Sequence, residues 1–165
     1  MDDDDVFDAD ESAGFDEVER RHVRDVVGIT DFDWVRADSP SPRNPLPVPL
    51  AEARVTLVTT AGAHEPGARP PGAGGGAVLL PADAPVELTH PGYDTARAMA
   101  DPDVVYPVRR LRVLVDEGFI GSLAPTVIST MGFVPDGRRL LSRAVPAAVE
   151  AMSDDEAHLA LLVPA

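Results

Sequence analysis

The segment Arg54 to Thr60 (RVTLVTT) is the feature that most constrains the fold of this chain. Its β-branched and aliphatic residues form a nearly continuous run, which is typical of a strand buried on both faces. Gly62 follows at once and marks the end of the run. We therefore predict that this segment is a central, buried strand.

Further strands and helices follow this strand. Pro107 suits a first helical turn, Gly118 a helix end, and Pro146 a kink or an early helical turn. The predicted helices are 107–117 and 140–152; the predicted strands and short apolar runs are 77–80, 86–88, 119–124 and a final buried strand at 158–163. This alternation predicts an α/β fold of three layers, Rossmann-like, with a mainly parallel sheet.

Three regions divide the chain. Residues 1–14 are acidic with few apolar anchors, and we expect a disordered tail. Residues 15–50 hold an amphipathic helix over 15–27, expected to end at Gly28, and a strap with five prolines at 38–50. Residues 51–165 form the predicted α/β domain.

The charge is concentrated at the start of the chain. The net charge is -14, and residues 1–20, with ten acidic groups and one Arg, contribute -9 of it. The remaining residues are mildly acidic, so the sequence predicts no nucleic-acid partner and no anionic membrane partner. No transmembrane run and no basic signal start are present, which predicts a cytoplasmic protein.

Two residue types are missing. All 14 basic residues are Arg, which excludes Schiff-base and Walker-type Lys chemistry in these residues. The chain has no Cys, so it carries no disulfide, thiol nucleophile or Cys-based metal site. The acidic run Asp154–Glu156 lacks the ligand spacing of hard cations and is expected to be a solvated turn, so no metal site is predicted.

Ligands of parallel sheets bind beyond the carboxyl ends of the strands. We expect three such tips to converge, namely 59–64, Pro125–Thr126 and Pro164–Ala165. The last tip is the end of the chain itself, so the predicted domain looks incomplete at its C-terminus.

Polar residues near these tips are the candidate site. His64 is either an acid/base group or a loop histidine bound to the backbone. His90 and Asp94 form either a polar pair in the pocket or a turn in which Asp94 caps a helix starting near Thr95. The hydroxyls and backbone amides of the loops give the remaining substrate-binding candidates, which are Thr60, Gly62, Thr126 and Ser129.

Other motifs favour structural roles. Ser129 has no His or acid at a spacing that indicates a hydrolase triad. The glycines at 72–76 precede a strand and not a helix, so they are expected to be a flexible loop; a nucleotide-binding domain is a third, weaker hypothesis. Asp101-Pro102-Asp103 predicts a turn leading into a helix, and the arginines at 109–112 an exposed face or a pair with Asp116.

Several blocks in order carry a family resemblance. They are His90-Pro91-Gly92-Tyr93-Asp94, the stretch 101–112 (DPDVVYPVRRLR), the stretch 116–121 (DEGFIG), Leu123-Ala124-Pro125-Thr126 and Ser129-Thr130-Met131-Gly132. With the strand and its tip at 54–64, they make the chain resemble, from about Trp34 to Ala165, the selenoprotein B family of the glycine/sarcosine/betaine and D-proline reductases.

The resemblance implies an oxidoreductase that cleaves a carbon–nitrogen bond of a small amino-acid-like substrate. It implies a selenocysteine or cysteine nucleophile directly after Ala165, and no catalytic nucleophile within these residues. It also implies a pyruvoyl-type partner subunit with its pyruvoyl group, a selenoprotein A-like acceptor and thioredoxin as reductant.

Two explanations of the missing nucleophile are open at this point. Either the chain was ended at a UGA codon that is translated as selenocysteine, or it is a true truncation, and in both cases the 165-residue chain alone is expected to be inactive. Asp103 and Val127-Ile128 replace the family's usual Asn and His-Tyr. The alternative function is a non-catalytic binding or scaffold protein of the same fold.

Overall fold

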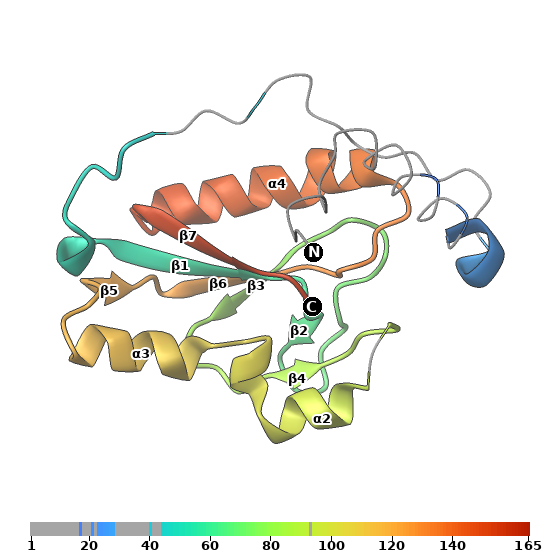
Figure 1. Ribbon diagram of the computed structural model, residues 1–165, viewed down its shortest axis with the longest axis horizontal. Helices are drawn as coiled ribbons and strands as arrows, with labels where there is room; N and C mark the ends of the chain where they lie inside the picture. The colour runs from blue at the N-terminus through green and yellow to red at the C-terminus, as the bar shows by residue number, and fades with distance from the viewer. Residues whose placement is uncertain (1–16, 18–20, 22, 29–39, 41–43, 93) are drawn as a thin grey trace, which may run out of the picture. The chain divides into compact units, whose positions relative to one another are not determined.

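The computed structural model describes residues 17, 21, 23–28, 40, 44–92 and 94–165 (Figure 1). The chain separates into two compact units, Met1–Trp34 and Val35–Ala165. In the first unit, Val23–Val27 (η1) forms a π-helical turn followed by Gly28 at φ +77°, where the sequence predicts a helix end. The predicted tail 1–14, most of the predicted helix and part of the proline strap lie outside the described residues.

The second unit is built around strand β1, Arg54–Thr59. On one side β1 pairs in parallel with β7, Leu159–Val163, from Val55–Leu159 to Thr59–Val163. On its other side it pairs in parallel with two short strands in succession, β5 (Ser122–Leu123) and β6 (Thr126–Ser129). Strand β3 (Val78–Pro81) joins β6 in the antiparallel direction. The predicted α/β class with a mainly parallel sheet is confirmed, while the Rossmann-like order of strands stays a prediction.

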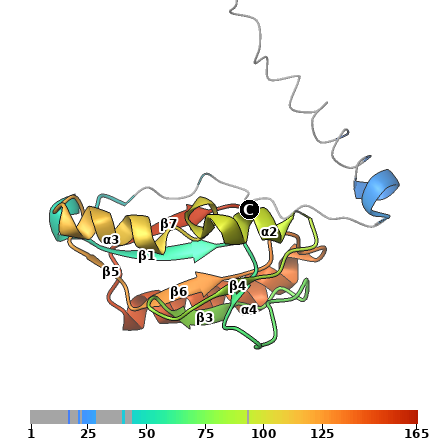
Figure 2. The same ribbon diagram turned by 90° about the horizontal axis from the view of Figure 1, so that it is seen from below.

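Helices cover the sheet on two sides. Helix α3, Val108–Asp116, and helix α4, Gly137–Asp154, lie on opposite faces of the sheet, as the two views show together (Figures 1 and 2). Short elements complete the unit: η2 (Leu50–Glu52), β2 (Ala63–His64), β4 (Glu87–Leu88), α2 (Thr95–Ala100) and η3 (Pro102–Val104). Strands β2 and β4 pair with each other as a separate antiparallel ribbon.

The main core lies between the sheet and α3. Val55 and Leu57 of β1 belong to one buried cluster with Leu111 of α3 and Leu80 of β3. Because successive side chains of a strand point to opposite faces, Val55 and Leu57 lie on the same face of β1, the face toward α3. The apolar face of α3 that the sequence predicts therefore packs on the sheet as expected.

Helix α4 is longer than its predicted range of 140–152. Its N-cap is Asp136, whose carboxylate accepts a hydrogen bond from the Arg138 backbone N–H at 3.2 Å. Pro146 lies inside the helix, where its ring removes one hydrogen-bond donor. The glycine loop packs beside the first turn of α4: a Cβ on Gly75 would lie 2.7 Å from the Leu140 nitrogen.

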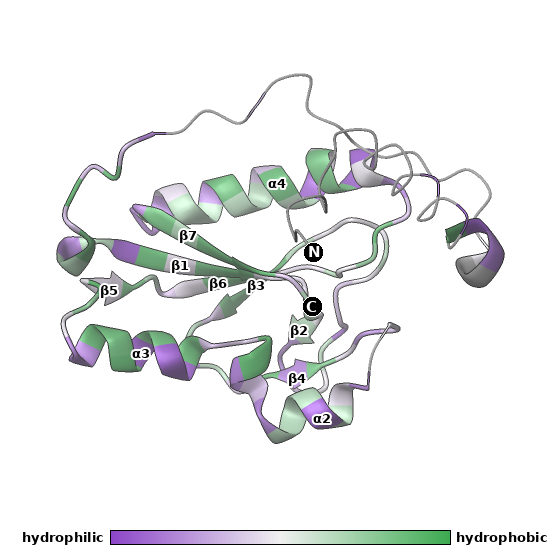
Figure 3. Ribbon diagram, in the orientation of Figure 1, coloured by the Kyte–Doolittle hydropathy of each residue, from purple (hydrophilic) through white to green (hydrophobic). Residues whose placement is uncertain are grey.

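The predicted burial of the last strand is wrong. In the described part of the chain β7 pairs with β1 alone, so it is an edge strand, and Leu162 is 68% exposed. Leu159 and Leu161 are also exposed, as are Leu141, Val145 and Val149 on successive turns of α4. Figure 3 shows the hydrophobic colour along both elements. Exposed apolar side chains are thus found on the edge strand β7 and on α4. Among the described residues, no helix is both long enough and apolar enough to cross a membrane.

The start of β6 is held by a carboxylate, which gives a test of the fold. The Asp155 Oδ2 accepts a hydrogen bond from the Thr126 backbone N–H at 2.9 Å. We expect Asp155→Ala to lower the free energy of unfolding by about 2 kcal/mol, because a partly buried amide loses a charged acceptor. The adjacent Asp154→Ala is the control, since Asp154 is exposed at the end of α4 and its removal should change stability by less than about 0.5 kcal/mol. Chemical denaturation of both variants measures the difference; equal losses would contradict the assignment.

Candidate functional site

The carboxyl ends of β1 and β7 meet at one edge of the sheet. The Thr60 backbone N–H donates to the Val163 carbonyl at 3.1 Å, and the Ala165 N–H donates to the Thr60 Oγ1 at 2.8 Å. The Thr60 hydroxyl in turn donates to the Ala165 carbonyl at 3.3 Å. The terminal segment therefore ends at the predicted 59–64 tip, with its last residue fixed by one threonine.

His90 approaches the same edge across Gly132. A Cβ on Gly132 would lie 2.6 Å from the Ala165 carbonyl oxygen and 2.8 Å from His90 Nε2. Both groups therefore lie within a side chain's reach of one glycine, which must stay a glycine for them to remain there. In the sequence Gly132 stands out only as part of the block 129–132, because the close approach of other groups to it exists only in the folded chain.

The imidazole of His90 has a defined protonation state. Its Nδ1 accepts a hydrogen bond from the Gly92 backbone N–H at 3.0 Å, so the neutral ring carries its proton on Nε2, the nitrogen next to Gly132. Burial lowers the pKa of His90 below the usual 6.5, because desolvation disfavours the charged ring. The edge thus presents a neutral imidazole N–H, which can donate a hydrogen bond.

His64 is engaged within the fold. It is 4% exposed, its Nδ1 lies 2.9 Å from the Glu65 carbonyl and its Nε2 lies 3.0 Å from the Thr89 Oγ1. With Nδ1–H as the donor to the carbonyl, Nε2 accepts from the threonine hydroxyl. Both ring nitrogens are occupied, one of them by the backbone, as expected for a histidine with a structural role.

Gly62 makes a close contact that positions His90. Its φ is +68°, a left-handed conformation, and a Cβ there would collide with the Thr89 carbonyl oxygen. Its N–H donates to the Thr130 carbonyl at 3.0 Å, and its carbonyl accepts from the Thr89 N–H at 3.2 Å. Gly62 therefore joins the tip of β1 to the segment that carries His90.

Thr126 is not part of this edge. The predicted tip at Pro125–Thr126 is wrong, because the chain resumes the strand at Thr126 and β6 ends only at Ser129. The Thr126 carbonyl accepts from the Thr56 Oγ1 at 3.0 Å and its N–H is bound by Asp155, so its backbone belongs to the sheet. The true tip of this strand is at 130–132.

Ser129 and Asp94 have different surroundings. Ser129 is 0% exposed at the end of β6, and its Oγ has no hydrogen-bond partner among the described residues. Asp94 is exposed and its carboxylate accepts from the Ala96 N–H at 3.0 Å, which confirms the predicted cap of α2.

The arginines at 109–112 contact groups other than Asp116, the partner that the sequence suggests. Arg109 and Arg110 pair with Asp103 at 2.7 and 3.3 Å, whereas Arg112 donates to the Ala82 carbonyl at 2.9 Å. The predicted Arg112–Asp116 pair is not formed between these described side chains. Asp103 lies in the short helix η3, so the predicted turn and helix lead-in are confirmed.

The chain is similar to known reductase proteins. Residues 80–139 match the family model of the glycine/sarcosine/betaine reductase selenoprotein B. The chain is also 28% identical over 142 residues to the D-proline reductase subunit gamma of Acetoanaerobium sticklandii, a match that covers 83% of this chain. The chain spans 59% of the length of that relative. No solved structure matches. The first two findings confirm the resemblance to the selenoprotein B family that the sequence blocks carry.

Gly62 and Gly67 form a matched pair for testing the edge. Both have a left-handed φ, +68° and +74°, but only at Gly62 would a Cβ meet backbone atoms, while at Gly67 nothing lies within 4 Å. We expect Gly67→Ala to cost about 1 kcal/mol of unfolding free energy and Gly62→Ala to cost about 3 kcal/mol or more. Thermal and denaturant unfolding measure both; similar losses for the two variants would show that the Thr89 contact is unimportant.

The pH dependence of stability tests the burial of His90. Because the pKa of His90 is lowered in the folded chain, the unfolded chain binds a proton first as the pH falls below 6.5, and the folded state loses stability there. We expect the stability advantage of the wild type over His90→Gln to shrink between about pH 7.5 and about pH 5.5. Denaturation of the two proteins across this range measures it. An advantage that is constant, or that grows in acid, would contradict a neutral buried imidazole.

Proposed function

We propose that this relative of the selenoprotein B family is a subunit of a reductase of the glycine/sarcosine/betaine or D-proline type. In this proposal the C-terminal edge of the sheet is the reaction site, and a selenolate or thiolate attached directly after Ala165 is the nucleophile. The observation that carries the proposal is the fixation of Ala165 by Thr60 beside His90 and Gly132.

The nucleophile would attack the substrate carbon and displace the amine. A dithiol reductant would then supply the two electrons that release the product and restore the nucleophile. The chain's own residues would provide the setting. Thr60 fixes the backbone from which the nucleophile extends, and the missing side chain of Gly132 leaves space beside it. The Nε2–H of His90 would donate a hydrogen bond to the substrate at this edge.

The substrate would be a small amine-bearing carboxylic acid. Thr60 and the backbone at 130–132 make this edge polar, in keeping with a small polar ligand. Gly62 and Asp94 would act through the positions they give to neighbouring segments, Gly62 by its contact with Thr89 and Asp94 by capping α2.

Partner subunits are part of the proposal. The exposed leucines of β7 lie on an open strand edge, and α4 carries a further exposed apolar row; such surfaces are of the kind that a subunit contact covers. We propose a pyruvoyl-type subunit, with its pyruvoyl group, as a partner, and a selenoprotein A-like acceptor and thioredoxin in the same cycle. A scaffold protein of the same fold is the alternative, favoured by the absence of Cys from this chain.

A cysteine added directly after Ala165 tests the proposed site. We expect its thiol to react with a neutral disulfide about tenfold faster at neutral pH than a cysteine at an exposed helical position, because hydrogen-bond donors at the edge stabilise the thiolate. The rate against pH gives the thiol pKa. Glu150→Cys on α4 is the control, since Glu150 is exposed.

His90 should account for part of this effect. Adding His90→Gln to the extended chain should bring the rate and the thiol pKa closer to those of the control. An added thiol whose pKa equals that of the Glu150→Cys control would sink the catalytic proposal and leave the scaffold alternative. Reductive cleavage of D-proline or glycine, assayed with the extended chain, a pyruvoyl-type subunit and a dithiol, then distinguishes the substrates.

A further inference from the structure

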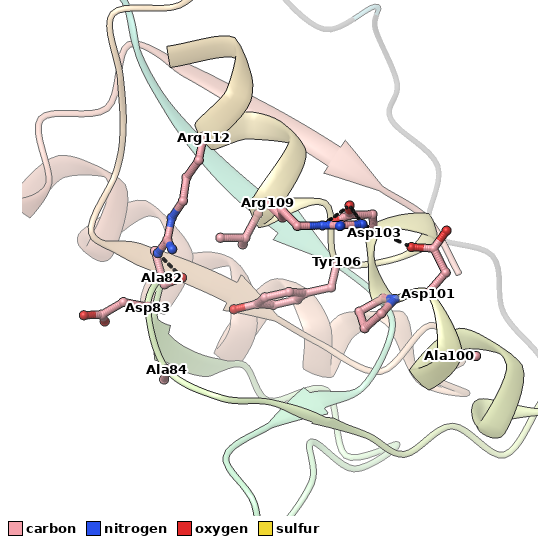
Figure 4. Close-up of a pocket in the computed structure, with 11 residues that line it drawn as sticks. Ala82, Asp83, Ala84, Ala100, Asp101, Asp103, Tyr106, Arg109 and Arg112 are labelled. Atoms are coloured by element: carbon pink, nitrogen blue, oxygen red, sulfur yellow. Dashed lines mark hydrogen bonds and ion pairs between the residues drawn. The ribbon is translucent and has the colours of Figure 1, made fainter. Parts of the chain in front are cut away.

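A cavity lies on the α3 side of the sheet, apart from the edge that carries Ala165. Its volume is about 500 Å³, within the size range of pockets for small molecules. The residues that line it are 82–84, 100–103, Tyr106, and Val108, Arg109 and Arg112 of α3. Figure 4 shows these side chains, with the Tyr106 ring between the segment 82–84 and the side chains of Asp101 and Asp103.

Tyr106 has an unused polar group. The residue is 5% exposed, and its hydroxyl is buried without a hydrogen-bond partner among the described residues. Burial raises the pKa of Tyr106 to about 12, although the positive charge of Arg112 acts in the opposite direction. The hydroxyl is therefore protonated at neutral pH, and it gains a hydrogen bond from any acceptor that reaches it.

Arg112 has spare hydrogen-bond donors at the same place. Its guanidinium donates one N–H to the Ala82 carbonyl at 2.9 Å and makes no ion pair within the described part of the chain. A guanidinium carries five N–H donors, and a carboxylate is a stronger acceptor for them than a neutral carbonyl. Arg112 is exposed, so its side chain can turn from Ala82 toward a ligand.

The other charged residues that line the cavity favour a ligand with a single negative charge. Asp103 is paired with Arg109 and Arg110, and Asp101 lies 3.7 Å from Arg109, so these two carboxylates are compensated. Asp83 lines the cavity, is exposed and has no ion pair in the part of the chain that the structure describes. A dianion such as phosphate would meet Asp83 with a charge that Arg112 alone cannot balance.

We propose that this cavity is a binding site for a small organic monocarboxylate, whose oxygens accept from the Tyr106 hydroxyl and from the Arg112 guanidinium. The site is independent of the proposed reductase function, because it requires neither the nucleophile nor the sheet edge. The chemistry of the two donors selects the carboxylate, and the apolar wall formed by Ala82, Ala84, Pro102 and Val108 selects a short aliphatic chain.

Titration of the full chain with butyrate, followed by two-dimensional amide NMR, tests the site. We expect saturable shifts at residues 82–84, 101–106 and 112, and weaker binding by about tenfold for Arg112→Gln and about fivefold for Tyr106→Phe. Arg143→Gln is the matched control, because Arg143 is an exposed arginine of α4 outside the cavity, and it should bind like the wild type.

Butyramide, which has the same shape without the charge, and inorganic phosphate should each produce no saturable shift at these residues. Binding of butyramide as tight as that of butyrate, shifts confined to other parts of the chain, or unchanged affinity in both variants would each overturn the proposal. The comparison of butyrate with butyramide on the wild type decides the question even if a variant does not fold.

Discussion

The pairing of β1 on both of its sides is the interaction on which the rest of this structure depends. Leu57 and Thr59 are 0% exposed, and every parallel contact of the sheet is made with this one strand. Its two buried threonines do not interrupt the apolar environment, because the Thr56 hydroxyl donates to the Thr126 carbonyl and the Thr59 hydroxyl to the Val105 carbonyl. The β-branched threonines therefore serve both strand formation and the fixing of neighbouring segments.

The candidate site is assembled by close approaches of backbone rather than by a set of charged side chains. Gly62 lets the tip of β1 contact Thr89, and Gly132 lets both His90 Nε2 and the Ala165 carbonyl lie close to its own backbone. Each approach requires the absence of a Cβ, so the site depends on two glycines from separate loops. Such a site holds its groups in place without long side chains, whose immobilisation costs conformational entropy.

Continuous apolar runs and helix signals were sufficient to predict β1, α3 and the α/β class. The β-branched run at 54–60 and the Pro107 to Gly118 limits of α3 depend on local residue chemistry, which a single sequence displays directly. The burial of β7 could not be predicted in the same way. An apolar run such as HLALLV has the same composition at a sheet edge and at a sheet centre, and only the pairing of the folded chain separates the two.

The site was predictable only where a residue adjoins a strand end in sequence. Thr60 follows β1 directly, so its place at the edge could be predicted from the order of the elements. Thr126 was placed wrongly because Ala124-Pro125 looks like the end of a strand, whereas it is a break within one line of pairing to β1. Tyr106 and Arg112 gave no signal, since an orphan hydroxyl and a spare guanidinium are recognisable only once their surroundings are known.

The two proposed sites share the end of one strand and yet should act separately. Thr59 and Thr60 are consecutive, so their side chains point to opposite faces of the sheet. The Thr59 hydroxyl holds the Val105 carbonyl, next to Tyr106 of the cavity, while the Thr60 hydroxyl holds Ala165 at the edge. A ligand that moved Val105 would break its hydrogen bond with the Thr59 hydroxyl, which costs about 1 kcal/mol, but would leave β1 held by its pairing on both sides. The rigidity of β1 therefore separates the chemistry of the sheet edge from occupancy of the cavity.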